Sequence, residues 1–198
     1  MIDEKKIPCV AGSSGLVGSY LLKNLSKLYP KVISISRREI KFSKNNVSNV
    51  IVDFDNLENE DILKEIDHLY IALGTTRKKA GSAKNFKKVD YHYCINLARI
   101  AYNFGVKRIS VVSSVGSNPN SNLLYPRTKG RLEKELSKLP FEHISIMKPG
   151  IILGNRKESR IFEQIAKYIF SIITPLLFGG LTKYKSIHAS DISKATVP

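Results

Sequence analysis

The stretch Val10-Ala11-Gly12-Ser13-Ser14-Gly15-Leu16-Val17-Gly18 decides the fold of this chain. Its three glycines, Gly12, Gly15 and Gly18, come directly after a β-rich apolar run and before a helical stripe of leucines that ends at Leu28. Glycine in these places lets the chain turn sharply, lets the backbone approach a pyrophosphate and lets the helix lie close to its strand. A helix that begins here also offers unpaired N–H groups to an anion. The stretch therefore predicts a dinucleotide-binding strand–turn–helix unit.

Outward from this loop, short β-rich runs alternate with longer helical patterns. We expect strands over residues 7–11, 32–36, 50–52, 69–72, 109–112 and 144–147, and helices over residues 16–28, 57–66, 86–104 and 126–139. This alternation is typical of βαβ units, and it predicts an α/β fold in three layers, a doubly wound parallel sheet of the Rossmann kind. The length suits a single domain over residues 1–198, in which residues from about 151 to 198 form a cap on the substrate side.

The composition is that of an ordinary globular chain. Hydrophobic residues make up 42% and charged residues 25% of the sequence, and no apolar run reaches the roughly 18–20 residues that cross a bilayer. The N-terminal stretch has acidic residues and no apolar signal core, so nothing there directs secretion. Cys9 and Cys94 fall in apolar patterns and are expected to be core thiols in a reducing compartment. A cytoplasmic protein without a transmembrane segment is expected.

Charge and histidine spacing restrict the classes of ligand. The net charge of +15 attracts polyanions, which include phosphorylated cofactors, nucleic acid and anionic membranes. The lysines are spread along the chain, which favours an ordinary solvated surface. The sequence has no nucleic-acid recognition motif, so nucleic acid is not the partner we expect. The four histidines show no metal-ligand spacing, and no metal site is predicted.

The end of the second strand indicates which dinucleotide the fold takes. An NAD-binding fold places a carboxylate there for the ribose 2′-hydroxyl, whereas a 2′-phosphate requires cations. The sequence reads Ser36-Arg37-Arg38, with Glu39 one place later. Two guanidinium groups hold a phosphate dianion by forked hydrogen bonds, although a solvated arginine pair is the alternative. We therefore predict NADP(H), with Asp53, at the end of the third strand, beside the adenine.

Tyr125 and Lys129 are spaced i, i+4 at the start of the helix expected after the fifth strand, so they share one face of it. A phenol with its ordinary pKa of about 10 is a poor acid–base catalyst at neutral pH. A neighbouring ammonium favours the phenolate, and the same ammonium can bind the nicotinamide ribose. The spacing alone occurs often by chance. Its place in a dinucleotide fold is what predicts a proton-transfer pair.

Two serines, Ser113 and Ser114, end the fifth strand and are candidates for the hydroxyl that orients a substrate carbonyl. We favour Ser114, because the Ser-Val-Gly turn places its hydroxyl at the carboxyl end of the strand. A shift of one residue changes the face of the sheet, so Ser113 is the alternative.

A longer pattern runs through the whole chain. It consists of the loop Leu73-Gly74-Thr75-Thr76-Arg77-Lys78-Lys79-Ala80-Gly81-Ser82, Phe86, Val89-Asp90, Ser113-Ser114, residues 125–130, Lys148-Pro149-Gly150 and Glu158-Ser159-Arg160. In these residues the chain resembles the short-chain dehydrogenase/reductase superfamily, and within it the atypical NAD(P)-binding Rossmann oxidoreductases of the TIP30/HTATIP2 kind and their bacterial relatives. The resemblance implies an NADP(H) cofactor more strongly than it implies a particular reaction.

The resemblance and the motifs together give a set of expected site residues. At the cofactor we expect Gly12, Ser14, Gly15, Leu16, Val17 and Gly18 in the phosphate loop, Arg37 and Arg38 at the 2′-phosphate, Asp53 at the adenine, Leu73 and Gly74 beside the adenosine ribose, and Lys129, Ile152 and Arg160 at the nicotinamide end. The expected catalytic set is Tyr125 as proton donor or acceptor, Lys129 as its partner and Ser114.

Three functions are compatible with these residues. The first is an NADP(H)-dependent enzyme that transfers hydride to or from a small carbonyl, alcohol or sugar-like substrate. The second is a non-catalytic NADP(H) sensor that binds a protein partner or forms a homodimer, and the third is nucleic-acid binding. The complete Ser, Tyr and Lys set favours the enzyme. The apolar segment over residues 161–178 would cover the substrate end of the sheet in the first case and form a partner or membrane surface otherwise.

Overall fold

The computed structural model describes residues 6–57, 61–150, 152–153, 187–188 and 191. Within them, six strands form one parallel sheet in the order β3-β2-β1-β4-β5-β6. The strands are β1 (Pro8–Ala11), β2 (Val32–Ser36), β3 (Val47–Ile51), β4 (His68–Ile71), β5 (Arg108–Val112) and β6 (His143–Met147). This is the strand order of a doubly wound NAD(P)-binding Rossmann fold. The direction in which successive strands are added reverses between β1 and β4. The predicted α/β fold is confirmed.

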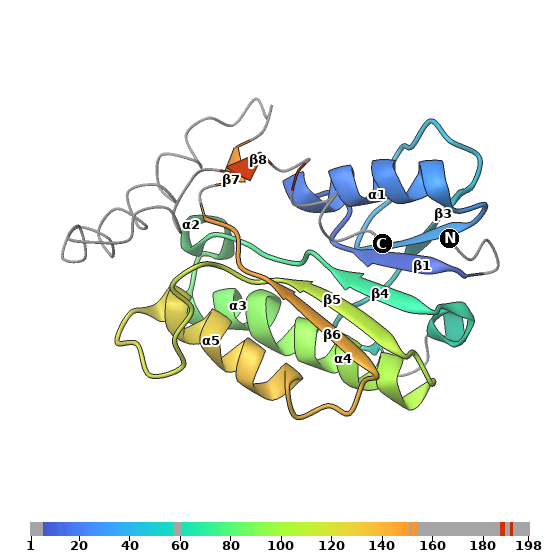
Figure 1. Cartoon of the computed structure of the whole chain (residues 1–198). Coiled ribbons are helices and arrows are strands. Elements are labelled where there is room, and N and C mark those ends of the chain that lie inside the picture. Colours follow the sequence, from blue (N-terminus) through green and yellow to red (C-terminus); the bar gives the residue numbers. More distant parts are fainter. Residues whose placement is uncertain (1–5, 58–60, 151, 154–186, 189–190, 192–198) are drawn as a thin grey trace.

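Helices cover both faces of the sheet. They are α1 (Leu16–Leu28), the 3₁₀ helix η2 (Asp61–Glu65), α2 (Arg77–Ala80), α3 (Ala83–Lys87), the π-helical turn η3 (Lys88–His92), α4 (Tyr93–Asn103) and α5 (Leu124–Leu136). Figure 1 shows α1 on one face of the sheet and α3, α4 and α5 on the other. The fold therefore has the three predicted layers.

The core consists of two apolar layers, one on each face of the sheet. Val10 and Tyr70 pack with Leu21 of α1 on one face. Cys9 and its strand neighbours pack with α4 and α5 on the other, since successive side chains of a strand point to opposite faces. Cys9 and Cys94 are both buried, free thiols, as predicted.

Two elements around β3 differ from their predictions. The strand begins at Val47, not at residue 50. The helix expected over residues 57–66 is wrong, because the described part of this connection holds only the 3₁₀ turn η2. Leu63 is buried from this short turn and Leu57 is buried ahead of it, so the apolar positions that suggested a helix are satisfied by a compact connection.

The helix expected over residues 86–104 is continuous in direction but not uniform. It divides into α3, the π-helical turn η3 and α4, and the N–H of Tyr93 donates to the carbonyl of Lys88, five residues earlier. Gly105, predicted as the C-cap, follows the cap residue Phe104 with a φ of +83°. The N–H of Gly105 donates to the carbonyl of Tyr102, and the N–H of Val106 to that of Ala101. These two bonds form a Schellman motif. The short helix α2, in a segment expected to be a loop, was missed.

The last described helix, α5, begins two residues before the predicted start at Pro126. Pro126 is therefore the third helical residue, where its missing N–H costs no intrahelical bond. Tyr125 lies within the first turn. It is thus carried by a regular helix and not by the preceding loop.

Beyond β6, the structure describes the short parallel pair β7 (Ile152–Leu153) and β8 (Ile187–His188). The predicted cap over residues 151–198 and the apolar segment over residues 161–178 otherwise lie outside the described residues. Among the helices that are described, none has the length and apolar character needed to cross a bilayer.

Candidate functional site

The glycine loop lies at the carboxyl end of β1, at the point where the strand order reverses. Gly12 has a φ of +89°, and a Cβ added there would stand 2.6 Å from the carbonyl oxygen of Ala72, beside β4. A Cβ on Gly18 would stand 2.3 Å from the carbonyl oxygen of Gly12. These separations exclude a side chain at both positions. The loop therefore brings bare backbone to the edge of the sheet, as a pyrophosphate site requires.

A row of polar side chains supports this loop from beneath. Ser13 Oγ lies 2.6 Å from Ser34 Oγ of β2, and Ser34 donates to Oδ1 of Asn49 on β3 at 3.1 Å. Ser36 Oγ donates to the carbonyl oxygen of Arg38 at 2.5 Å. The row ties the glycine loop to the middle of β2 and β3, and the Ser36 bond fixes the turn that carries the arginines.

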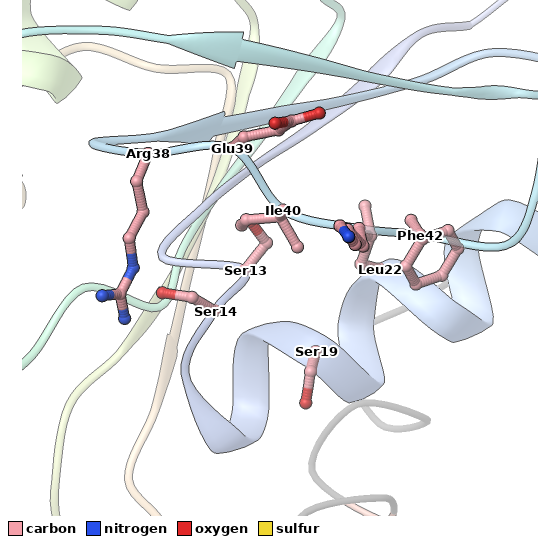
Figure 2. Close-up of a pocket in the computed structure, with 9 residues that line it drawn as sticks. Ser13, Ser14, Ser19, Leu22, Arg38, Glu39, Ile40 and Phe42 are labelled. Atoms are coloured by element: carbon pink, nitrogen blue, oxygen red, sulfur yellow. The ribbon is translucent and has the colours of Figure 1, made fainter.

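A cavity of about 390 Å³ opens beside the glycine loop. Its lining residues are Ser13, Ser14, Ser19, Leu22, Arg38, Glu39, Ile40, Lys41 and Phe42. Figure 2 shows the Arg38 guanidinium directed toward the Ser14 side chain and the Glu39 carboxylate directed away from it. Two cations and several hydroxyls thus face one concave surface, which suits a phosphate.

The predicted site residues near this cavity are not equivalent in the structure. All three residues are exposed, but Arg38 and Ser14 line the cavity whereas Arg37 does not. The Val17 side chain is buried against the core and Leu16 packs on its edge, so these two residues offer their backbone and not their side chains to a ligand.

Asp53 is held in a local turn after β3. Its Oδ1 accepts from the N–H of Asp55 at 2.9 Å, and its Oδ2 accepts from Nδ2 of Asn56 at 2.7 Å. The side chain is exposed. Its carboxylate thus caps a turn, and a role at the adenine stays a prediction.

The loop after β4 runs beside the glycine loop, because Ala72 directly adjoins Gly12. Leu73 packs against the core and Gly74 is exposed. The backbone N–H of Thr75 donates to Oδ2 of Asp90 at 2.7 Å. One buried carboxylate therefore anchors the loop expected to pass the adenosine ribose.

Lys129 does not stand as an isolated charge beside Tyr125. Its Nζ lies 3.0 Å from Oδ1 of Asp90, and the two side chains are 5% and 2% exposed. Burial alone opposes the ammonium, but the negative charge of Asp90 raises the pKa of Lys129, so it stays protonated. The Tyr125 ring lies 6.0 Å from that of Phe86 in a tilted contact. The predicted Tyr–Lys pair thus includes a carboxylate that the sequence interpretation omitted.

The two serines after β5 point to different partners. Ser113 Oγ donates to Oε1 of Glu133 on α5 at 2.5 Å, and Glu133 Oε2 pairs with Nζ of Lys148 at 2.7 Å. Ser114 Oγ donates only weakly, to the carbonyl oxygen of Val115 at 3.1 Å. Glu133 therefore occupies the Ser113 hydroxyl, which favours Ser114 as the serine available to a substrate.

Asp90 and Glu133 are residues to which the sequence interpretation gave no role, although Asp90 belongs to the pattern shared with the family. A signal for Asp90 was present, since it stands in the apolar stripe that runs through Phe86, Cys94 and Leu97, all buried. A carboxylate in such a stripe is buried and requires a partner. Glu133 likewise continues the face of Tyr125 and Lys129 at the next i+4 position.

The structure does not describe the side chains of two predicted site residues at the nicotinamide end. Arg160 lies outside the described residues, and for Ile152 only the backbone is described, in β7. The described residues include no group of three or more His, Cys, Asp or Glu side chains placed to hold a metal ion.

Comparison with known proteins gives three main matches. A family model described as HIM1 matches residues 20–179. Protein FMP52, mitochondrial, of Candida albicans (strain SC5314) is 37% identical over 196 residues, which are 95% of this chain and 85% of that protein. Protein HTATIP2 of Rattus norvegicus is 36% identical over 173 residues, which are 84% of this chain and 71% of that protein. The names of the fungal relatives do not support the cytoplasmic location expected from the sequence.

Among solved structures, MoeE5 in complex with UDP-glucose and NAD has a similar fold. Its TM-score is 0.73 at 18% identity, with 96% of this chain and 70% of that chain covered. This likeness concerns the fold alone.

Proposed function

This chain belongs to the HIM1 family together with HTATIP2 and the FMP52 proteins, and has the NAD(P)-binding Rossmann fold of atypical short-chain dehydrogenases/reductases; from this premise we propose that it is an NADP(H)-dependent oxidoreductase. Its substrate is a small carbonyl, alcohol or sugar-like compound. The proposal has a cofactor part and a reaction part, which rest on different residues.

The observation that carries the proposal is the cavity beside the glycine loop. Gly12 and Gly18 leave no room for a Cβ, so the backbone is bare where a diphosphate would lie. Arg38 and Lys41 supply two positive charges in the adjoining cavity, and Ser14 supplies a hydroxyl. Glu39 is also in the lining, but its carboxylate is directed away from Ser14 (Figure 2), so the donor set fits the 2′-phosphate of NADP(H) better than the free ribose hydroxyl of NAD(H).

The reaction part rests on the start of α5 and the end of β5. The bound cofactor supplies hydride chemistry at its nicotinamide ring. In the proposed reaction, Tyr125 Oη gives or takes the proton of the substrate oxygen and Ser114 Oγ donates a hydrogen bond to that oxygen. Lys129, charged and buried, holds the nicotinamide ribose and faces the phenol from one turn further along the helix.

Cofactor binding tests the first part directly. The chain has no tryptophan, so the fluorescence of NADPH itself is the clean signal in a titration of the purified protein. We expect NADPH to bind more tightly than NADH. Absence of NADPH binding would remove the basis of the proposal.

A screen of aldehydes and ketones for NADPH oxidation tests the reaction part. On any active substrate, Tyr125→Phe is expected to reduce kcat by at least about a hundredfold, since it deletes the proton donor, and to leave NADPH affinity unchanged. Full turnover by the Phe variant would contradict the role of Tyr125.

A second candidate is an NADP(H)-binding regulator without turnover. The specific observation in its favour is that Asp90 neutralises Lys129, which reduces the positive charge available to a catalytic phenol. NADPH binding without oxidation of any carbonyl in the screen, together with a protein partner or self-association whose affinity depends on the nucleotide, would favour this candidate.

A further inference from the structure

A row of four polar side chains lies beside the cavity at the glycine loop; it consists of Ser13, Ser34, Ser36 and Asn49. The three serines are at most 5% exposed. Ser34 and Ser36 stand on β2, which is buried at every position, and such a strand in a parallel sheet ordinarily carries apolar side chains. A buried hydroxyl costs stability unless it is hydrogen-bonded. The stability of this polar row therefore depends on how its hydrogen atoms are shared.

Four contacts hold the polar row together and join it to the turn after β2. Ser13 Oγ lies 2.6 Å from Ser34 Oγ. Asn49 Oδ1 lies 3.1 Å from Ser34 Oγ and 3.0 Å from Ser36 Oγ, and Ser36 Oγ lies 2.5 Å from the carbonyl oxygen of Arg38. The three hydroxyls supply only three hydrogens for these four contacts, whereas Asn49 Nδ2 is buried without a hydrogen-bond partner. With the amide in this orientation, one contact lacks a hydrogen and two amide hydrogens are unused.

A half-turn of the Asn49 amide about its Cβ–Cγ bond exchanges its oxygen and nitrogen and supplies the missing hydrogen. The two atoms are alike in size, so the hydrogen-bond network decides between the orientations. After the half-turn, Nδ2 donates one hydrogen to Ser34 and the other to Ser36, and Ser36 donates to the carbonyl of Arg38. Ser34 then donates to Ser13. All four contacts have a hydrogen, and only the amide oxygen lacks a partner, which a buried carbonyl tolerates better than an N–H does.

The direction of the hydrogen bonds decides what Ser13 offers to a ligand. Ser13 lines the cavity together with Ser14 and Arg38 (Figure 2). A Ser13 hydroxyl that donates to Ser34 presents a lone pair to the cavity, whereas one that accepts from Ser34 has its own hydrogen left to donate there. The oxygens of a phosphate dianion only accept hydrogen bonds, but a ribose hydroxyl both donates and accepts. The half-turned amide therefore suits a phosphate in the cavity.

We propose that Asn49 and Ser34 are positioning residues that fix the Ser13 hydroxyl as a hydrogen-bond donor to the 2′-phosphate of the cofactor. The inference rests on the proposed NADP(H) site and adds a determinant of selectivity to it. Asn49 stands on β3, which β2 separates from β1 and its glycine loop, so it acts on the ligand through Ser34 and Ser13. The polar row strengthens the binding of NADPH and leaves that of NADH unchanged, because the 2′-hydroxyl of NADH adapts to either direction.

Two variants test the direction of the polar row by titration with NADPH and with NADH. Ser13→Ala removes the donor, so we expect NADPH affinity to fall about tenfold, the effect of one hydrogen bond to a charged group. Asn49→Asp keeps the shape of the side chain but has only acceptor oxygens, so Ser34 donates to it and the polar row is reversed. NADPH affinity should again fall by about tenfold or more. NADH affinity should stay the same in both variants.

The carboxylate of Asn49→Asp also carries a charge, which repels a phosphate in either direction of the polar row. A double-mutant cycle separates the two effects. If Asn49 acts through the Ser13 hydroxyl, the loss caused by Asn49→Asp should shrink at least about fivefold in the Ser13→Ala background. Ser48→Asp is the matched control, because it adds the same charge at the neighbouring, exposed position of β3, whose side chain points to the opposite face. It should change neither affinity.

A third variant keeps the inference testable where Asn49→Asp fails to fold. Ser34→Ala removes the hydroxyl between Asn49 and Ser13 and adds no bulk to the strand. Without the donor that fixes Ser13, NADPH affinity should fall about threefold, the effect of one neutral hydrogen bond, and NADH affinity should not change.

Four results would overturn the inference: NADPH affinity at the wild-type level in Ser13→Ala, the same affinity in Ser34→Ala, equal losses of NADPH and NADH affinity, and the same loss from Asn49→Asp with and without the Ser13 hydroxyl. The last would mean that charge alone acts on the phosphate. Failure of the wild-type chain to bind NADPH at all would instead refute the proposed function.

Discussion

At the scale of single residues, the two adjacent arginines after β2 are expected to contribute differently to NADPH affinity. Arg38 lines the cavity beside the glycine loop and Arg37 does not. Arg38→Ala is therefore expected to lower NADPH affinity by about tenfold or more, because a forked charge-assisted contact is lost. NADH affinity should stay the same, since NADH has no 2′-phosphate. Titration of both nucleotides checks this, with Arg37→Ala as the matched control; an equal loss in the control would place the phosphate elsewhere.

Two glycines of the phosphate loop differ in how little room they leave for a Cβ. A Cβ on Gly18 would stand 2.3 Å from the carbonyl oxygen of Gly12, whereas a Cβ on Gly15 would stand 3.0 Å from the same atom. Gly18→Ala must push α1 away from the loop, so we expect it to lower the free energy of unfolding by about 2–3 kcal/mol and to abolish NADPH binding. Gly15→Ala should cost less. Urea denaturation and NADPH titration of both variants measure the two effects. A larger loss of stability in Gly15→Ala than in Gly18→Ala would contradict the prediction.

His68 makes stability depend on pH. Its Nε2 lies 2.9 Å from Ser110 Oγ and its ring stacks on Tyr70 at 4.0 Å. Burial, with the positive charges of Arg108 and His143, lowers the pKa of His68 to about 4. The unfolded value is about 6.5, so the folded state resists protonation. The stability contribution of the neutral ring is complete above about pH 6.5 and is lost as the pH falls toward about 4.

The measurement for His68 is the free energy of unfolding against pH. In the wild type, this residue should account for a loss of about 3 kcal/mol over that window. His68→Gln should flatten the profile there, whereas His92→Gln, at an exposed histidine, should leave it unchanged. An unaltered profile in His68→Gln would mean that other groups cause the acid sensitivity.

At the scale of elements, helix α5 offers a test of how the strand ends are fixed. Glu133 bridges Ser113 after β5 and Lys148 after β6. Glu133→Ala leaves both partners without their acceptor, so we expect the free energy of unfolding to fall by about 1–3 kcal/mol. Glu135→Ala removes a carboxylate from the same helix that pairs with Lys138, 59% exposed, and should have no measurable effect. Chemical denaturation of both variants decides; equal losses would contradict the bridging role.

The helices also show what periodicity can and cannot predict. The apolar stripe of α1 and the cap at Gly105 follow from spacing and from glycine, and both were confirmed. The π-helical turn η3 was not predicted, because an apolar stripe with one extra residue in a turn still looks helical. Short α2 was missed for another reason. Its four residues form no stripe, and it depends on the Thr76 cap, whose side chain accepts from the N–H of Lys79.

At the scale of the whole molecule, the sheet and the glycine loop were predictable because they depend on local pattern and on a topology that few alternatives satisfy. The partner of Lys129 was not predictable in the same way. Asp90 and Lys129 are far apart in sequence, and their contact exists only because α5 packs against η3. The sequence indicates which charged residues are buried. Tertiary packing decides which of them meet.

The net charge of +15 gives the last prediction, which concerns the response of the whole molecule to salt. Repulsion among excess cations opposes the compact state, and salt screens it, since the Debye length falls from about 30 Å at 0.01 M to about 8 Å at 0.15 M. The free energy of unfolding should therefore rise with NaCl over this range, because exposed pairs such as Lys31–Glu65, 46% and 52% exposed, contribute little in the opposite direction.

NADPH affinity should fall over the same range, because the anionic nucleotide is attracted by the cations that salt screens. Thermal unfolding and NADPH titration at each concentration, with a neutral osmolyte at matched osmolality as the control, give the two slopes. Stability that falls with salt would mean that local ion pairs outweigh the net charge, and salt-independent NADPH binding would mean that the nucleotide does not use Arg38 and Lys41.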